Sequence, residues 1–151
     1  MNGEGKPFPV IQTEFEERHG QFSPDGQWVA YQSNESGRFE IYARSFRGSA
    51  RPVRMSIAGG AQARWNPAGN ELFYMGLDGR LMAVPVRPSS DRQSLEAGTP
   101  IPLFQTHSPR AVEHIDGQHY VVSPDGQRFL VNTAVTGDAI PISIILNWKP
   151  K

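Results

Sequence analysis

Four histidines carry most of the chemistry that this sequence could offer. With their charged neighbours they define a candidate ligand or partner face, made of His19, His107, Arg110, Glu113, His114 and His119. Imidazole and carboxylate groups in one loop could hold a metal ion or transfer protons, and Arg110 beside His114 could bind a carboxylate or a phosphate. The last three histidines are spaced by seven and then five residues, which matches no helical metal-binding motif. We therefore favour a solvated polar rim over a metal or acid–base site.

The composition excludes several other kinds of chemistry. The chain has no cysteine, which excludes disulfides and thiolate metal sites. It also contains no Gly-x-Ser-x-Gly elbow, phosphate-binding loop or kinase signature. Its 15 basic and 15 acidic residues balance, so no electrostatic surface for nucleic acid is expected. The sequence predicts no cofactor and no nucleic-acid partner.

The sequence shows no sign of a membrane or export signal. No apolar run approaches the roughly 18 residues of a membrane helix, and residues 1–6 lack the apolar core of a signal peptide. We expect no membrane span in this chain. The compartment stays unassigned, because a longer protein containing this chain could be cytoplasmic or periplasmic.

A tight turn that recurs along the chain indicates which elements must position these residues. Its copies are Ser23-Pro24-Asp25-Gly26, Asn66-Pro67-Ala68-Gly69 and Ser123-Pro124-Asp125-Gly126. Each copy is followed by an apolar run, and the prolines are 43 and then 57 residues apart. A period of about 40–50 residues with several short strands is typical of a β-propeller blade. The sequence therefore predicts an all-β propeller with about three four-stranded antiparallel blades.

The residues of the turn have structural roles that explain their types. Proline presets φ at the second position, and glycine supplies the positive φ at the fourth. The serine hydroxyl and the aspartate carboxylate can bond local backbone amides. Asp25 and Asp125 could instead be catalytic or metal-binding, but the middle copy keeps the pattern with Ala68 at that position. We therefore predict that all three turns are structural.

The strands follow from these turns. We expect middle strands at 28–33, 72–75 and 128–132, and next strands at 39–46, 81–86 and 141–148, with Pro85 fraying or kinking the second of these. Outer strands are expected at 9–13, 52–56 and 102–106, and no helix is expected. The domain prediction is one isolated outer strand at 7–13 and blades at about 19–57, 61–106 and 118–149.

The outer strand provides the clearest internal copy. Pro9-Val10-Ile11-Gln12-Thr13 nearly repeats Pro102-Leu103-Phe104-Gln105-Thr106. The first of these strands has no blade of its own, and the last blade has no outer strand. The two ends are therefore complementary.

The sequence from Phe22 to Tyr31, with Glu40-Ile41-Tyr42 on the next strand, resembles the PD40 (WD40-like) repeat of TolB-type β-propellers. The later series, from Glu71-Leu72-Phe73-Tyr74 to Leu146-Asn147-Trp148, resembles the C-terminal blades of propellers attached to bacterial eukaryotic-like serine/threonine kinases. The resemblance covers roughly residues 7–149. It implies the propeller fold, and any kinase activity would belong to a domain outside this chain.

Three blades cannot close a ring alone, because closed propellers have about 4–8 blades. The resemblance implies half of a six-bladed ring. Either a missing part of a longer chain or a second copy would complete it, the latter by exchanging strand 8–13. We expect a non-enzymatic scaffold that binds a protein, a peptide or another ligand, or the regulatory tail of a larger signalling protein. The alternative is a propeller hydrolase or lyase with its site at the histidine-rich face.

Overall fold

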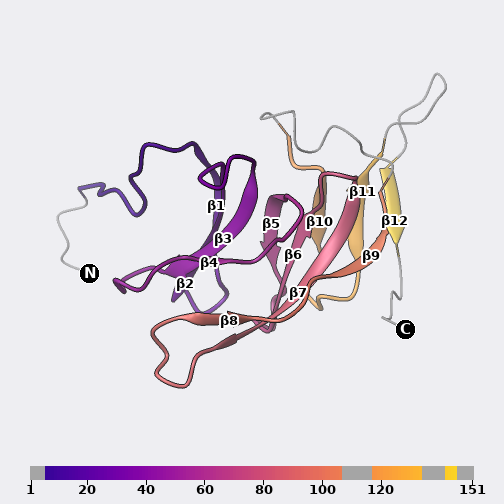
Figure 1. Ribbon diagram of the computed structural model, residues 1–151. Helices are drawn as coiled ribbons and strands as arrows, with labels where there is room; N and C mark the ends of the chain where they lie inside the picture. Colours follow the sequence, from indigo (N-terminus) through magenta and orange to yellow (C-terminus); the bar gives the residue numbers. More distant parts are fainter. Residues whose placement is uncertain (1–5, 107–116, 134–141, 146–151) are drawn as a thin grey trace.

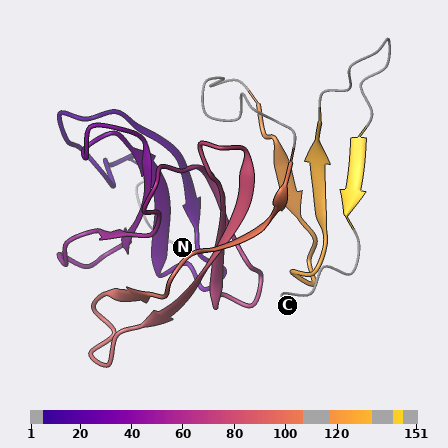
Figure 2. The same ribbon diagram turned by 45° about the vertical axis from the view of Figure 1, so that its right-hand side comes forward.

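A computed structural model of the 151-residue chain describes residues 6–106, 117–133 and 142–145. All regular structure in these residues is β-strand, arranged in three antiparallel sheets that follow one another in chain order (Figures 1 and 2). No helix in the described residues is long and apolar enough to cross a membrane. The prediction of an all-β fold with four-stranded units is confirmed, and each sheet is called a blade below.

The first blade contains β1 (Glu17–Phe22), β2 (Trp28–Ser33), β3 (Glu40–Ser45) and β4 (Val53–Arg54), paired in that order. Strand β2 is buried along its whole length, which explains its nearly continuous apolar sequence, since a strand covered on both faces needs no polar side. It coincides with the predicted middle strand. The outer strand predicted within 7–13 is not formed in this structure. Residues 6–16 contain no strand and run along the side of this blade that faces away from the second (Figure 1).

The second blade contains β5 (Ala61–Trp65), β6 (Glu71–Met75), β7 (Arg80–Pro88), β8 (Leu95–Ala97) and β9 (Ile101–Gln105). Strands β5 to β8 pair in order, and β9 also pairs with β7. The first part of β7 pairs with β9, and the part after Pro85 pairs with β8. The outer edge of this blade is therefore divided between two short strands, of which only β9 was predicted.

The predicted fraying of the strand at Pro85 is not seen. Strand β7 continues to Pro88, and Pro85 faces Glu71 in register with β6. The Pro85 carbonyl accepts a hydrogen bond from Gly98 N–H at 2.8 Å. The nitrogen of Pro85 faces that same side, where the chain passes between β8 and β9 outside any strand, so the missing N–H breaks no ladder bond.

The third blade contains β10 (Tyr120–Val122), β11 (Phe129–Asn132) and β12 (Ile142–Ile145). Strand β11 follows the third copy of the turn, as predicted. Strand β12 lies within the predicted range 141–148, and the rest of that range lies outside the described residues.

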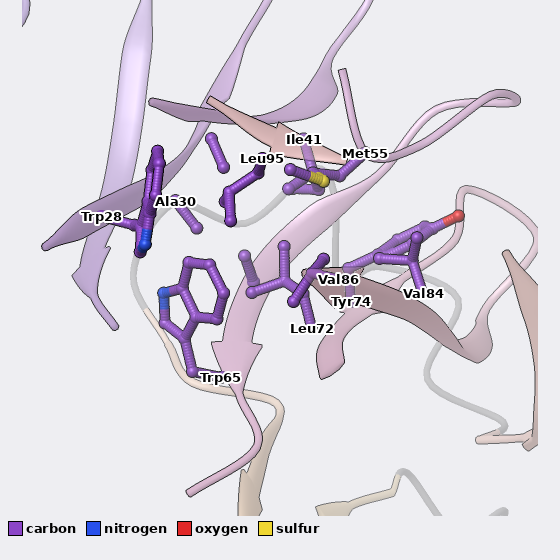
Figure 3. Close-up of a cluster of buried hydrophobic side chains, with 12 residues drawn as sticks. Trp28, Ala30, Ile41, Met55, Trp65, Leu72, Tyr74, Val84, Val86 and Leu95 are labelled. Atoms are coloured by element: carbon purple, nitrogen blue, oxygen red, sulfur yellow. The ribbon is translucent and has the colours of Figure 1, made fainter. Parts of the chain in front are cut away.

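Two apolar clusters join the three blades. The first lies between blades one and two and includes Trp28, Ala30, Ile41, Met55, Trp65, Leu72 and Tyr74 (Figure 3). The second lies between blades two and three and includes Phe73, Met75, Leu81, Tyr120, Phe129 and Val131. Burying a large apolar side chain contributes about 1.5–3 kcal/mol, so these two clusters hold the blades in place.

The blades can be compared position by position, by counting from the first residue of each turn. Leu72 and Phe129 are equivalent in this sense, and each packs against the blade that precedes its own. Phe73 and Leu130, one position later, point to the opposite side of their sheets because side chains alternate along a strand. We call the side that packs on the preceding blade the back face, and the other side the front face.

Candidate functional site

The six residues predicted to form a ligand or partner face are divided by the structure. His107, Arg110, Glu113 and His114 lie outside the described residues. His19 lies within β1, and His119 lies immediately before β10. These two histidines occupy equivalent positions, four residues before the first residue of their turns.

His19 lies at an irregular point of β1. Its φ is 53°, and the pairing with β2 shifts register between Arg18 and Gln21. The Nδ1 atom of His19 is buried and has no hydrogen-bond partner among the described residues. This bulge turns the histidine out of the regular alternation of the strand.

Gln62 occupies the same position in the second blade, and it is the residue that sequence reasoning missed. It has a φ of 54°, and its strand shifts register at the same point as β1 does. The Gln62 side chain accepts a hydrogen bond from His119 N–H at 2.9 Å and donates one to the Gly117 carbonyl at 3.0 Å. The Gln62 carbonyl accepts a bond from the Tyr120 hydroxyl at 2.8 Å.

Gln62 therefore fastens the second blade to the start of the third. The Tyr120 hydroxyl in this contact is fully buried, and this burial raises its pKa far above the ordinary range, so the phenol stays neutral and can donate. Counting back four residues from each turn would have found this position, because it aligns Gln62 with the two histidines. The residue type alone gave no signal.

We predict that Gln62→Ala lowers the free energy of unfolding by about 1–3 kcal/mol, because it removes the partners of His119 N–H and the Gly117 carbonyl. Urea unfolding would measure this loss. Gln105→Ala is the matched control. The Gln105 amide also bonds a carbonyl, that of Asp78 at 2.9 Å, but this residue is exposed, and a change below about 0.5 kcal/mol is expected. Equal losses in the two variants would contradict a fastening role.

The first turn is held by its own polar side chains. The Ser23 hydroxyl donates to Asp25 Oδ1 at 2.5 Å, and Gln27 N–H donates to the same oxygen at 3.0 Å. Trp28 N–H donates to Ser23 Oγ at 2.9 Å. The Ser23 hydroxyl is the largest cause that holds the pKa of Asp25 below its usual value. Asp25 is thus engaged with its own turn.

The third turn repeats this geometry. The Ser123 hydroxyl and Gln127 N–H both donate to Asp125 Oδ1, and Arg128 N–H donates to Ser123 Oγ. The Ser123 hydroxyl again lowers the pKa of Asp125 most. Pro24, Pro67 and Pro124 stand at the second positions, and Gly26, Gly69 and Gly126 have φ values of 68°, 77° and 70°. The middle copy is held differently. Its Asn66 stands at the position of the serines, and Asn66 Oδ1 accepts Ala68 N–H at 3.0 Å.

A further copy of the turn, absent from the predictions, joins β7 to β8. The Ser89 hydroxyl donates to Asp91 Oδ1 at 2.5 Å, and Gln93 N–H donates to the same oxygen at 3.0 Å. Arg92, with a φ of 55°, stands where the other copies have glycine. The copy keeps serine, aspartate and glutamine at the first, third and fifth positions. It was missed because the sequence was searched for turns with proline and glycine, and this copy has neither.

One end of the blades exposes apolar side chains. At this end lie the hairpins 34–39 and 76–79 and the segment 55–60 that joins the first two blades, and we call it the link end. Ile57 is 61% exposed and Leu77 is 41% exposed. A Cβ atom placed on Gly59 would lie 2.2 Å from Leu77 Cδ1, so the Leu77 side chain rests directly on segment 55–60. Leu77 thus contacts the segment that carries Ile57, and we call the exposed apolar side chains of Ile57 and Leu77 the apolar patch of the link end.

Segment 55–60, which carries Ile57, is anchored by hydrogen bonds to a buried carboxylate. Glu40 is fully buried and accepts hydrogen bonds from the Ser56 hydroxyl, from Gly59 N–H at 2.9 Å and from Arg38 Nε at 2.8 Å. Arg38 also donates to the Ile57 carbonyl at 2.9 Å. Segment 55–60 is thus fixed at both ends of the Ser56–Gly59 stretch. An apolar patch on a rigid base can bind a partner at a lower ordering cost than a flexible segment can.

The described residues contain no group of three or more acidic or histidine side chains that could hold a metal ion. A shallow hollow lies between β7 and β8, lined by Pro85, Val86, Arg87, Glu96, Ala97 and Gly98. It lies beside the exposed ion pair of Arg87 and Glu96. None of the residues that line it belongs to the predicted face.

No family model matches the sequence, and no curated protein matches it either. Solved structures do resemble it. TolB from Acinetobacter baumannii superposes with a TM-score of 0.55 at 18% identity, over 86% of this chain and 30% of that chain. Oligogalacturonate lyase from Vibrio parahaemolyticus gives 0.58 at 14% identity, over 93% of this chain and 34% of that chain. A 6-phosphogluconolactonase-like protein from Bacteroides uniformis gives 0.54 at 19% identity, over 82% and 34%.

These similarities concern the fold, since the identities are low, and this chain spans about a third of the length of each protein. The similar structures include TolB and a protein named as a lyase, so the fold is shared by proteins of different function. The expected propeller architecture is confirmed. The chain has the fold of consecutive blades of a TolB-like β-propeller.

Proposed function

We propose that this chain is the part of a β-propeller that binds a protein or peptide partner through the apolar patch at its link end. The observation that carries the proposal is the contact of Leu77 with Gly59, two residues after Ile57, because both Ile57 and Leu77 are exposed at this end of the blades. Large exposed apolar side chains in one patch are typical of interaction sites.

Charged side chains surround this patch. Arg38, Asp78 and Arg80 have side chains that are about half exposed. An apolar centre with a charged rim is the usual composition of a protein interface. The partner that fits is a peptide segment with an apolar side chain at its centre and charged residues on both sides.

The test begins with affinity capture on the immobilised full chain, with the bound proteins quantified by mass spectrometry. The binding affinity of a purified peptide from the most enriched protein is then measured. We expect Ile57→Asp combined with Leu77→Asp to reduce its binding at least tenfold, about 1.4 kcal/mol. Ile101→Asp is the control, because Ile101 is also exposed but lies on the edge strand β9. Unchanged binding by the double variant, with an unchanged circular dichroism spectrum, would contradict the proposal.

The proposal extends to the larger assembly. The resemblance to kinase-attached propellers supports a regulatory role within a signalling protein, and the share of TolB that the chain spans supports the need for further blades. We propose a second copy of the chain as the partner that supplies them. The rival hypothesis, a hydrolase or lyase, predicts that alanine at His107 and His114 abolishes a measurable activity, whereas the binding module predicts little change.

A further inference from the structure

The back face of the first blade exposes an aromatic residue at a position that is buried elsewhere. Phe22 is 56% exposed, whereas its equivalent Trp65 is 8% exposed and donates from Nε1 to the Gln21 carbonyl of the preceding blade at 3.1 Å. The Phe22 ring packs edge-on against Phe46 at 4.9 Å, and Phe8 lies 6.1 Å from Phe46. These three aromatic rings mark the place where a preceding blade would pack.

The front face of the third blade exposes apolar side chains where a following blade would pack. Val121 and Leu130 lie opposite each other in register, and both are exposed. Phe73, the equivalent of Leu130 in the second blade, is 3% exposed and packs edge-on against Phe129 of the following blade at 4.9 Å. Leu130 is thus exposed at a position that, in the second blade, is covered by the blade that follows.

The role of β9 indicates what its near copy at residues 9–13 does. Strand β9 pairs with β7, and Phe104 reaches the following blade, with its ring 5.7 Å from Phe129. Thr106, the last residue of the copied segment, donates from its hydroxyl to the Gly79 carbonyl at 2.6 Å. Residues 9–13 match residues 102–106 at the proline, the glutamine and the threonine, and both segments have two apolar residues between the proline and the glutamine. They already lie along the back of the first blade (Figure 1).

We propose that two copies of this chain form a closed pair. The back face of the first blade of each copy packs on the front face of the third blade of the other, which places Phe22 against Leu130. Residues 9–13 of each copy pair with β12 of the other, as β9 pairs with β7. This inference deepens the proposed function, since it names the faces and the strand through which a second copy supplies the missing blades.

The faces are tested by size exclusion with light scattering on the full chain. The wild type is expected at twice 16.8 kDa, and Phe22→Asp and Leu130→Asp are each expected at the monomer mass. An equimolar mixture of the two variants should recover the double mass, because one of its two contacts has both native faces. Ile57→Asp, at an exposed residue on the link end, is the control and should keep the wild-type mass.

The strand exchange is tested by a disulfide, which the absence of native cysteine makes specific. The register of β9 on β7 pairs Phe104 with Leu81, and by equivalence it places Ile11 opposite Ile142 of the second copy. The variant Ile11→Cys with Ile142→Cys should therefore form a covalent dimer on oxidation. Ile11→Cys with Ile57→Cys is the control and should not.

A wild-type monomer or aggregate would overturn the closed pair while leaving peptide binding at the link end intact. A dimer that both aspartate variants preserve would overturn the faces. A disulfide that forms within one chain would overturn the exchange. Loss of peptide binding by the Ile57 and Leu77 variant with an unchanged dimer mass would support both proposals separately.

Discussion

Phe129→Ala is expected to lower the free energy of unfolding by about 3–5 kcal/mol, the range for truncating a buried phenylalanine. Phe129 is 1% exposed, and its ring meets those of Phe73, Phe104 and Tyr120 at 4.9, 5.7 and 6.5 Å. It is thus the centre of the contact between the second and third blades. Its loss leaves a cavity that the three surrounding rings cannot fill.

Urea unfolding at a fixed protein concentration measures this loss, and hydrogen exchange locates it. The amides of β10 and β11 should lose protection before those of β2 and β6, because the first apolar cluster is untouched. Phe15→Ala makes the same substitution at a residue that is 41% exposed, and its cost should stay below about 1 kcal/mol. Uniform loss of protection in all three blades would show that the blades do not separate at this contact.

Glu40→Ala is expected to cost about 3 kcal/mol, because it leaves the buried Ser56 hydroxyl and Gly59 N–H without their acceptor. It should also weaken partner binding at the link end, since segment 55–60 would lose its anchor. Chemical unfolding gives the first effect, and binding of the captured peptide gives the second. A rise in the dissociation constant without a change at the interface residues themselves is the signature of a positioning role.

Glu96→Ala is the matched control for Glu40. Glu96 also pairs with an arginine, with 2.7 Å between Arg87 Nη2 and Glu96 Oε2, but its side chain is about half exposed. Exposed ion pairs contribute about 0–1 kcal/mol, so this variant should stay close to the wild type in both assays. If Glu40→Ala is as mild as Glu96→Ala, the buried carboxylate does not hold the segment.

The sequence predicted the elements whose signals are local. The middle strand at 28–33 follows from a turn and an apolar run, and the structure places β2 there. The outer strands at 52–56 and 102–106 were found through internal copies, and they correspond to β4 and β9. Local chemistry and repetition therefore predicted most strands of this fold, but they missed β8 and placed an outer strand at 9–13, where the structure has none.

The features that the sequence did not predict depend mostly on contacts between residues that are distant in the sequence. Gln62 has no catalytic character, and its role arises only because the bulge in β5 directs its amide to the start of β10. Glu40 is one acidic residue at the start of a strand, and only the folded chain brings Ser56 and Gly59 to it. Strand β8 was not predicted from the sequence, because the turn before it carries Arg92 in place of glycine.

The fourth turn also bears on how such chains diverge. Ser89 and Asp91 make the same bonds as Ser23 and Asp25 without proline or glycine, so the hydroxyl and the carboxylate are sufficient for the geometry. The proline and glycine that make the repeat recognisable in the sequence can therefore be substituted while the backbone of the turn keeps its conformation. This explains physically how the fold outlasts detectable ancestry, as in a chain that aligns with solved propellers yet matches no family model.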